Sequence, residues 1–168
     1  MDNKSFDEVI NISYSIRNTE PPGSYWIEST PKTDYPELKE DIQADVAVVG
    51  GGMVGITCAH LLAREGLKVV ILEADRLLQG TTGHTTAKVT SQHALIYDRL
   101  ITQMGQEKAR QYAEANENAI RFIADTVAEQ KIDCDFARRP AYVYTQSTGY
   151  VHQIEKEEKA ASVLGIKA

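Results

Sequence analysis

The chain has 168 residues, with 18 Lys and Arg against 24 Asp and Glu, and a formal charge of −6 at pH 7. Apolar residues make up 42% and charged residues 25%, which is the balance of an ordinary globular protein. No apolar run reaches the roughly 18–20 residues of a membrane-spanning helix, and no cluster of Lys and Arg indicates a nucleic-acid surface.

The first residues, MDNKSFDEVI, lack the basic and apolar segments of a secretory signal. Cys58 and Cys134 lie far apart without the spacing of metal ligands, so we expect neither a disulfide framework nor a metal site. Cys58 falls within a helical pattern and is predicted to pack as a small apolar side chain. These features predict a cytoplasmic protein.

Residues 1–44 are polar, and we expect them to form an irregular arm. They carry four of the five prolines, at Pro21, Pro22, Pro31 and Pro36. The packed part of the chain is therefore expected to begin at about residue 45.

A strand–helix–strand unit is predicted directly after the arm. Asp45–Val49 is an apolar, β-branched run typical of a strand covered on both faces in a parallel sheet. Met53–Glu65 has helical periodicity, with Gly66 where a helix-ending glycine belongs. Leu67–Leu72 is a second apolar run. Together they predict an α/β fold built on a βαβ unit.

The rest of the chain alternates between polar and periodic segments. Residues 75–93 are rich in Gly and Thr and show no period, which favours a loop. Helices are predicted at about 95–104 and 106–130, followed by a strand at 141–145 and a charged amphipathic helix at 151–164.

A glycine-rich turn joins the first predicted strand to the first helix in the pattern G-x-G-x-x-G. Its first glycine permits a tight turn, its second lets a diphosphate approach the backbone, and its third lets the helix pack close to the strand. The amino end of the helix offers free N–H groups to the phosphates. The candidate dinucleotide contacts in this turn are Gly50, Gly51, Gly52, Met53, Val54 and Gly55.

An acidic residue at the end of the second predicted strand supports this interpretation. Glu73 lies about 20 residues beyond the glycines, where a carboxylate accepts hydrogen bonds from ribose hydroxyls. It also disfavours a 2′-phosphate, which argues against an NADP-type ligand. We include Glu73 and the adjacent Ala74 in the predicted site.

Residues 45–74 closely resemble the N-terminal region of FAD-dependent oxidoreductases of the D-amino acid oxidase/glycine oxidase family. Ser24-Tyr-Trp26 resembles the lead-in of that family, and residues 80–93 resemble its second flavin-contacting segment. The sequence of residues 80–93 is most similar to that of the subgroup with a C-terminal Rieske iron–sulfur domain. Residues 132–136 resemble the entry into the substrate domain.

This resemblance implies FAD, with its diphosphate at Gly50, Gly52 and Gly55 and its adenosine ribose at Glu73. It also implies that a second segment lies near the flavin. In some relatives a histidine in a similar setting tethers the flavin covalently. The sequence after His84 departs from that pattern, which favours a hydrogen-bonding role instead. The residues of this segment are Thr81, Thr82, Gly83, His84, Thr85 and Thr86.

The resemblance further implies oxidation of a carbon bearing an amine or hydroxyl group by hydride transfer to the flavin. Members of the family are much longer than this chain, so we expect an N-terminal part of a larger protein. Residues 45–131 would belong to the FAD-binding domain and 132–168 to the start of a substrate domain. The expected partners are a small-molecule substrate and the missing C-terminal region, which would hold any [2Fe-2S] cluster. No catalytic acid or base is identified.

Two alternative functions remain at this point, and one expectation concerns self-association. An NAD-dependent dehydrogenase would continue with further alternating βα units, which the Gly/Thr segment does not resemble. A non-catalytic dinucleotide-binding module is a second alternative. Two parallel strands alone also leave edges and a face uncovered, which favours self-association into a homo-oligomer.

Overall fold

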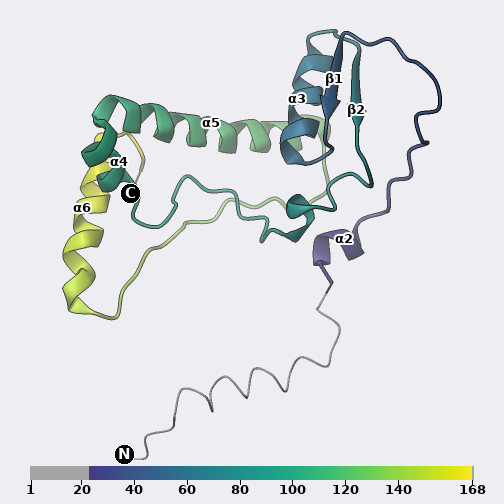
Figure 1. Cartoon of the computed structure of the whole chain (residues 1–168). Coiled ribbons are helices and arrows are strands. Elements are labelled where there is room, and N and C mark those ends of the chain that lie inside the picture. The colour runs from purple at the N-terminus through teal and green to yellow at the C-terminus, as the bar shows by residue number, and fades with distance from the viewer. Residues whose placement is uncertain (1–22, 168) are drawn as a thin grey trace, which may run out of the picture. The chain divides into compact units, whose positions relative to one another are not determined.

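The structure of the protein is a computed structural model, and it describes residues 23–167 (Figure 1). The described chain packs as two compact units: unit 1 ends at Thr86 and unit 2 begins at Ala87. No helix within residues 23–167 is long and apolar enough to cross a membrane. Pro21 and Pro22 of the expected arm lie outside the described residues.

Unit 1 contains the predicted βαβ unit. Strand β1 (Val46–Val49) leads into helix α3 (Met53–Arg64), and the chain returns as strand β2 (Val69–Leu72). The two strands are parallel, with Val46 opposite Val69 at one end of the register. Each strand is slightly shorter than its apolar run, and α3 packs against both (Figure 1).

One face of this sheet is open in the described residues, so the expectation of a strand covered on both faces is wrong here. Val46 and Val48 are half-buried, whereas Ala47 and Val49 are exposed, with Val49 at 85%. Alternate residues of a strand point to opposite faces, and α3 covers the face of Val46 and Val48. The same openness leaves Val54 of α3 76% exposed, although its helical position predicts burial.

Two short helical turns complete unit 1. Helix α2 (Tyr25–Ser29) lies in the expected arm, which is otherwise irregular from residue 30 to 44. The 3₁₀ turn η1 (Thr81–His84) lies in the Gly/Thr-rich segment. The two turns pack against each other, so the arm and this segment meet despite their separation in sequence.

Unit 2 consists of helices. They are α4 (Tyr97–Met104), α5 (Gln106–Gln130), the 3₁₀ turn η2 (Thr148–Tyr150) and α6 (Val151–Val163). The three predicted helices are confirmed, with α4 beginning two residues later than expected. Helix α4 packs against both α5 and α6. Small alanines let these helices approach closely, and the core residues are Tyr97, Leu100, Ala109, Ala113, Ala160, Ala161 and Leu164.

A buried carboxylate joins α6 to the amino end of α4. Glu157 is 7% exposed, and its Oε1 accepts hydrogen bonds from the N–H groups of Ile96 and Tyr97, both at 2.7 Å. Its Oε2 accepts from the N–H of Asp98 at 2.9 Å. Three N–H groups that a helix start leaves without partners are thus satisfied from another helix.

The prediction of a strand at residues 141–145 is wrong. This segment has no regular structure, and Tyr142 and Tyr144 are 80% and 82% exposed. Its β-branched and aromatic residues favour a strand, but a strand also needs a neighbour for its backbone groups. No strand lies beside it in the described part of unit 2.

Candidate functional site

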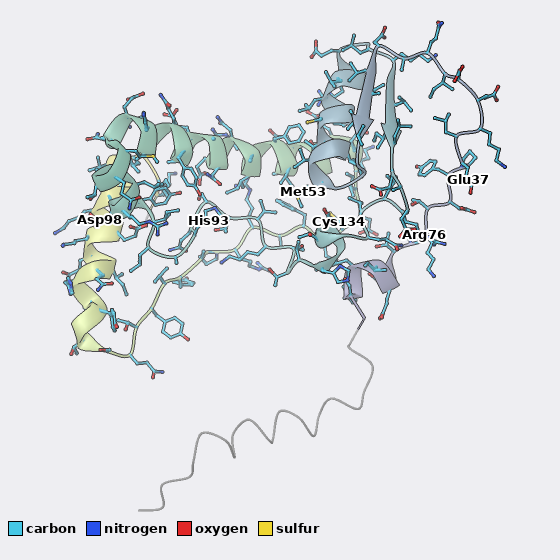
Figure 2. The ribbon with its side chains drawn as sticks, viewed as in Figure 1. Glu37, Met53, Arg76, His93, Asp98 and Cys134 are labelled. Carbon is cyan, nitrogen blue, oxygen red and sulfur yellow. The ribbon has the colours of Figure 1, made fainter. Side chains whose placement is uncertain are left out.

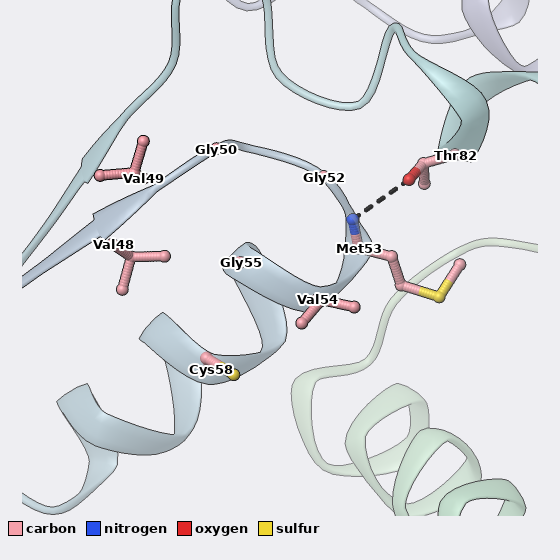
Figure 3. Close-up of a pocket in the computed structure, with 9 residues that line it drawn as sticks. All are labelled: Val48, Val49, Gly50, Gly52, Met53, Val54, Gly55, Cys58 and Thr82. Atoms are coloured by element: carbon pink, nitrogen blue, oxygen red, sulfur yellow. Dashed lines mark hydrogen bonds between the residues drawn. The ribbon is translucent and has the colours of Figure 1, made fainter.

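The glycine turn between β1 and α3 has the geometry that a diphosphate-binding turn requires (Figure 3). Gly50 has φ of +101°, a conformation that residues with side chains rarely adopt. Gly52 precedes the first residue of α3 in extended conformation and has no side chain of its own to cap the helix. A Cβ atom on Gly55 would lie 2.0 Å from the carbonyl oxygen of Gly50. Only glycine at position 55 therefore permits this approach of helix and turn.

Gly51, between the first two glycines of the motif, binds the turn to the segment that follows β2. The N–H of Gly51 donates to Oε2 of Glu73 at 2.6 Å, and the N–H of Leu78 donates to the carbonyl of Gly51 at 3.0 Å. Gly51 is buried, and a Cβ atom there would lie 2.2 Å from Cδ2 of Leu77. The two loops at the carboxyl ends of the strands are therefore locked together.

The Glu73 side chain is exposed, and each of its carboxylate oxygens accepts one hydrogen bond from a backbone N–H group. Besides the bond from Gly51, its Oε1 accepts from the N–H of Asp75 at 3.2 Å. These bonds, with that from Gly51 first, hold the pKa of Glu73 below its usual value of 4.5. Its carboxylate is therefore ionised at neutral pH. Because each carboxylate oxygen can accept more than one hydrogen bond, Glu73 retains the capacity to accept from ribose hydroxyls.

The turn η1 reaches the amino end of α3. The hydroxyl oxygen of Thr82 accepts a hydrogen bond from the N–H of Met53 at 3.1 Å (Figure 3). A Cβ atom on Gly52 would lie 3.6 Å from the same hydroxyl. Thr82 thus lies beside the helix N–H groups that favour an anion.

His84 is tied to its own turn. Its Nδ1 lies 2.9 Å from the carbonyl oxygen of Gly80. Since a carbonyl oxygen only accepts hydrogen bonds, Nδ1 must carry the hydrogen in this contact. The structure thus gives His84 a hydrogen-bonding contact of the kind that its sequence setting favours.

Two adjoining hollows surround the glycine turn, and Thr82 lines both. One, of about 450 Å³, lies over α3 and is lined by Val48, Val49, Gly50, Gly52, Met53, Val54, Gly55, Cys58 and Thr82 (Figure 3). The other, of about 520 Å³, lies over the loop after β2 and is lined by Gly51, Gly52, Glu73, Asp75, Arg76, Leu78, Gln79, Gly80, Thr81 and Thr82.

Nine of the residues predicted from sequence line these hollows, and five do not. Those outside the linings are Ala74, Gly83, His84, Thr85 and Thr86. Gly83 is buried against α2 and the loop after β2, whereas the other four are exposed. The structure therefore brings the glycine turn, Glu73 and the first half of η1 together.

Sequence reasoning missed most of the loop after β2. Asp75, Arg76 (labelled in Figure 2) and Gln79 line the second hollow. The rule that ligands bind at the carboxyl ends of parallel strands could have found them, because they follow β2 directly. Leu78 has φ of +64°, an uncommon conformation for a branched side chain, and such outliers concentrate at functional sites.

Cys58 was expected to be packed inside its helix, and this expectation is wrong. Its side chain is exposed and lines the first hollow. The reason is the same as for Val54. Both lie on the side of α3 that no described residue covers.

These residues fit a dinucleotide. The space over Gly50 is open, since a Cβ atom there would meet nothing within 4 Å, and Gly52 leaves the backbone accessible. The N–H groups at the start of α3 have the chemistry to hold a diphosphate, and the ionised carboxylate of Glu73 is able to accept hydrogen bonds from ribose hydroxyls. The fold and this site define a dinucleotide-binding protein of the Rossmann-like class.

Comparison with known families shows to which family of dinucleotide-binding proteins the chain belongs. The sequence profile of the family described as FAD dependent oxidoreductase matches residues 45–168. The chain belongs to this family, and FAD is the family's cofactor. The NAD-dependent alternative is therefore not supported.

Individual relatives agree with the family. YhfW of Bacillus subtilis (strain 168), whose name describes a Rieske 2Fe-2S iron-sulfur protein, is 47% identical over 148 residues, covering 88% of this chain and 29% of YhfW. Gamma-glutamylputrescine oxidoreductase of Escherichia coli (strain K12) is 32% identical over 119 residues, covering 70% and 28%. Mitochondrial dimethylglycine dehydrogenase of Rattus norvegicus is 35% identical over 84 residues, covering 42% and 10%.

The chain thus spans under a third of the length of these curated relatives. The similarity to YhfW agrees with the resemblance to the Rieske-associated subgroup. No solved structure matches the chain with significance.

Proposed function

We propose that unit 1 binds the ADP half of FAD in a protein that oxidises a small molecule. The observation that carries this proposal is the bond from the N–H of Gly51 to the carboxylate of Glu73, at 2.6 Å. It fixes the diphosphate-binding turn relative to the ribose acceptor, so that the diphosphate and the ribose of an ADP group meet prearranged partners. Preorganised partners lower the ordering cost of binding.

Each part of the site has an assigned role in this proposal. The N–H groups of Gly52 and Val54 bind the diphosphate, on either side of the N–H of Met53 that Thr82 accepts from. The carboxylate of Glu73 accepts from the ribose hydroxyls. Arg76 and Gln79 line the second hollow, where we place the adenosine. The hydroxyl of Thr82 shares the amino end of α3 with the diphosphate.

The remaining predicted residues have supporting roles in the proposal. Ala74 continues the chain past the ribose acceptor. The turn from Gly83 through His84 to Thr85 and Thr86 carries the chain toward the flavin end of the cofactor. We propose that His84 acts as a hydrogen-bonding residue, and its contact with the carbonyl of Gly80 is compatible with that role.

The bound cofactor would supply a two-electron acceptor for a hydride from a carbon that bears an amine or hydroxyl group. The residues of unit 1 hold and orient its adenosine end and do not themselves act on the substrate. We assign no catalytic acid or base within residues 23–167. The substrate-binding groups are proposed to belong to the complete protein.

We also propose a [2Fe-2S] cluster in the complete protein, because the Rieske protein YhfW covers most of this chain. A Rieske centre needs two cysteines and two histidines. Within residues 23–167, no group of His, Cys, Asp or Glu side chains could hold a metal ion. The cluster would accept electrons from the reduced flavin, and iron and sulfide analysis of the complete protein tests for about two irons per flavin.

Titration of the purified chain with FAD tests the proposed site. Binding should quench flavin fluorescence and shift the visible flavin bands. Replacing Glu73 with Ala removes the ribose acceptor and the partner of Gly51, and should weaken binding about tenfold or more.

Glu37→Ala is the matched control, because Glu37 is an exposed acidic residue of the same unit (labelled in Figure 2) and lines neither hollow. Its affinity should equal that of the wild type. Equal affinities for all three proteins would remove Glu73 from the site, and failure of the wild type to bind FAD would refute the proposed function.

A further inference from the structure

Helix α2 is bonded to the backbone of the Gly/Thr-rich segment at two points. The hydroxyl of Ser24 donates a hydrogen bond to the carbonyl oxygen of Gly83. The indole N–H of Trp26 donates to the carbonyl oxygen of Thr85 at 2.7 Å. Each bond spans 59 positions of sequence, so both fix the arm against a distant part of unit 1.

Packing around Gly83 holds the same two segments in contact. Gly83 is buried, and a Cβ atom there would lie 2.9 Å from the side chain of Ile27 on α2. On its other side the same atom would lie 2.6 Å from the carbonyl oxygen of Leu78. The turn η1 is therefore held between α2 and the loop after β2, with no room for a larger residue at this position.

This arrangement determines where the Thr82 hydroxyl lies. Thr82 immediately precedes the clamped Gly83, and its hydroxyl reaches the N–H of Met53 at the start of α3. Because both bonds from α2 go to backbone carbonyls, they constrain the path of the chain at Gly83 and Thr85. Loss of these bonds would free η1 to move away from the glycine turn.

We propose that α2 is a positioning element of the dinucleotide site, in which Ser24 and Trp26 hold η1 so that Thr82 lies over the amino end of α3. The proposal rests on the proposed function, since it concerns the same site. It assigns to the polar arm a role in cofactor affinity, although neither Ser24 nor Trp26 lines the hollows around the glycine turn.

The chain contains one tryptophan, and it is Trp26. Trp26 is 41% exposed, and its indole N–H bond to Thr85 makes its emission sensitive to the position of η1. If binding at the glycine turn orders η1, ADP should shift the emission of Trp26. ADP has no visible absorption, so such a shift does not arise from energy transfer to a flavin.

The test compares four variants of the chain. Ser24→Ala and Trp26→Phe each remove one hydrogen-bond donor to residues 83–85. Ser24→Thr retains a hydroxyl and should keep the bond to Gly83. Tyr25→Phe is the control on the same helix, because it keeps the ring that packs edge-on against Trp26. The measurements are FAD affinity, amide hydrogen exchange resolved by segment, and tryptophan emission with and without ADP.

For Ser24→Ala and Trp26→Phe, we expect FAD affinity to fall about three- to tenfold, the range for one lost hydrogen bond. Amide exchange at residues 80–86 should accelerate by a similar factor, while exchange in α3 stays at its wild-type rate. Ser24→Thr and Tyr25→Phe should behave as wild type, and both should retain the ADP-dependent shift of Trp26 emission.

Two outcomes would overturn the proposal while leaving the proposed function in place. One is wild-type FAD affinity in both Ser24→Ala and Trp26→Phe. The other is faster exchange throughout α3, which would show a general loss of unit 1 structure instead of a local effect on η1. Failure of the wild-type chain to bind FAD would instead refute the proposed function, and the role of α2 with it.

Discussion

Different interactions stabilise the interior of each of the two units. Unit 2 has a core of seven buried apolar residues from three helices and the residue that follows α6, and a buried carboxylate links two of those helices. In unit 1 the buried residues are Ala59 and two glycines, Gly51 and Gly83, among those described. Both glycines lie at the candidate site, where close backbone contacts and hydrogen bonds replace apolar packing.

This difference indicates where stability and function reside. Burial of apolar side chains is the main source of folding free energy, so unit 2 has the larger supply. Unit 1 instead fixes the positions of N–H groups and a carboxylate that a ligand can bind. We therefore expect substitutions in unit 2 to act on stability and those in unit 1 to act on FAD affinity.

The largest expected effect on stability comes from Glu157. Glu157→Ala leaves the N–H groups of Ile96, Tyr97 and Asp98 without their acceptor, and one hydrogen bond to a charged group contributes about 1.5–3 kcal/mol. We expect the free energy of unfolding to fall by at least about 3 kcal/mol, measured by urea denaturation followed by circular dichroism. Glu157→Gln keeps one carbonyl acceptor and should lose less.

The control for this substitution is Glu158→Ala, because Glu158 is the exposed neighbour on the same helix. Its unfolding free energy should change by less than about 0.5 kcal/mol. Equal losses for Glu157→Ala and Glu158→Ala would show that the link between α6 and α4 does not stabilise unit 2.

A second substitution should separate binding from stability in unit 1. Gly55→Ala places a methyl group 2.0 Å from the carbonyl oxygen of Gly50, which is backbone and cannot move aside without shifting the turn. We expect FAD binding to be lost and unit 1 to be destabilised by about 1–3 kcal/mol, as for other overpacked sites.

Gly149→Ala is the comparison, since a Cβ atom at Gly149 would lie at an ordinary contact distance of 3.7 Å from Oγ of Ser147. FAD titration and thermal denaturation of both variants check the prediction. Retention of wild-type FAD affinity by Gly55→Ala would show that close packing of α3 on the turn is not required for binding.

The elements of the fold were predictable where a single segment carries the signal. Apolar runs and a helix-ending glycine predicted β1, α3 and β2, and helical periodicity predicted the helices of unit 2. The same local reasoning failed for residues 141–145. Their side chains favour a strand, but a strand forms only beside a partner, which no local pattern supplies.

The candidate site was predictable in part for the same reason. The glycines and Glu73 follow a spacing that the sequence displays. The contact of Thr82 with Met53 and the bonds from α2 join residues far apart in sequence, and no periodicity of the sequence predicts them. Glu157 is one acidic residue among several on α6, and only its partners distinguish it.

The two units should also respond to opposite ends of the pH scale. In unit 2, burial raises the pKa of Tyr97 to about 12 from an ordinary value of 10. Its neutral phenol, which donates to the carbonyl of Ser91, is therefore favoured in the folded state. The resulting stabilisation is present in full below pH 10 and is lost as pH rises toward 12.

In unit 1 the sign is reversed, because hydrogen bonds from Gly51 and then Asp75 lower the pKa of Glu73 below 4.5. Its stabilisation is present above pH 4.5 and is lost as pH falls through the lower, folded-state pKa. Unfolding free energy measured across pH for the wild type, Tyr97→Phe and Glu73→Gln separates the two. Tyr97→Phe should remove only an alkaline component and Glu73→Gln only an acidic one. Because Glu73 is exposed, its component should be the smaller of the two. Identical pH profiles for Glu73→Gln and the wild type would show that the bond from Gly51 to Glu73 does not stabilise unit 1.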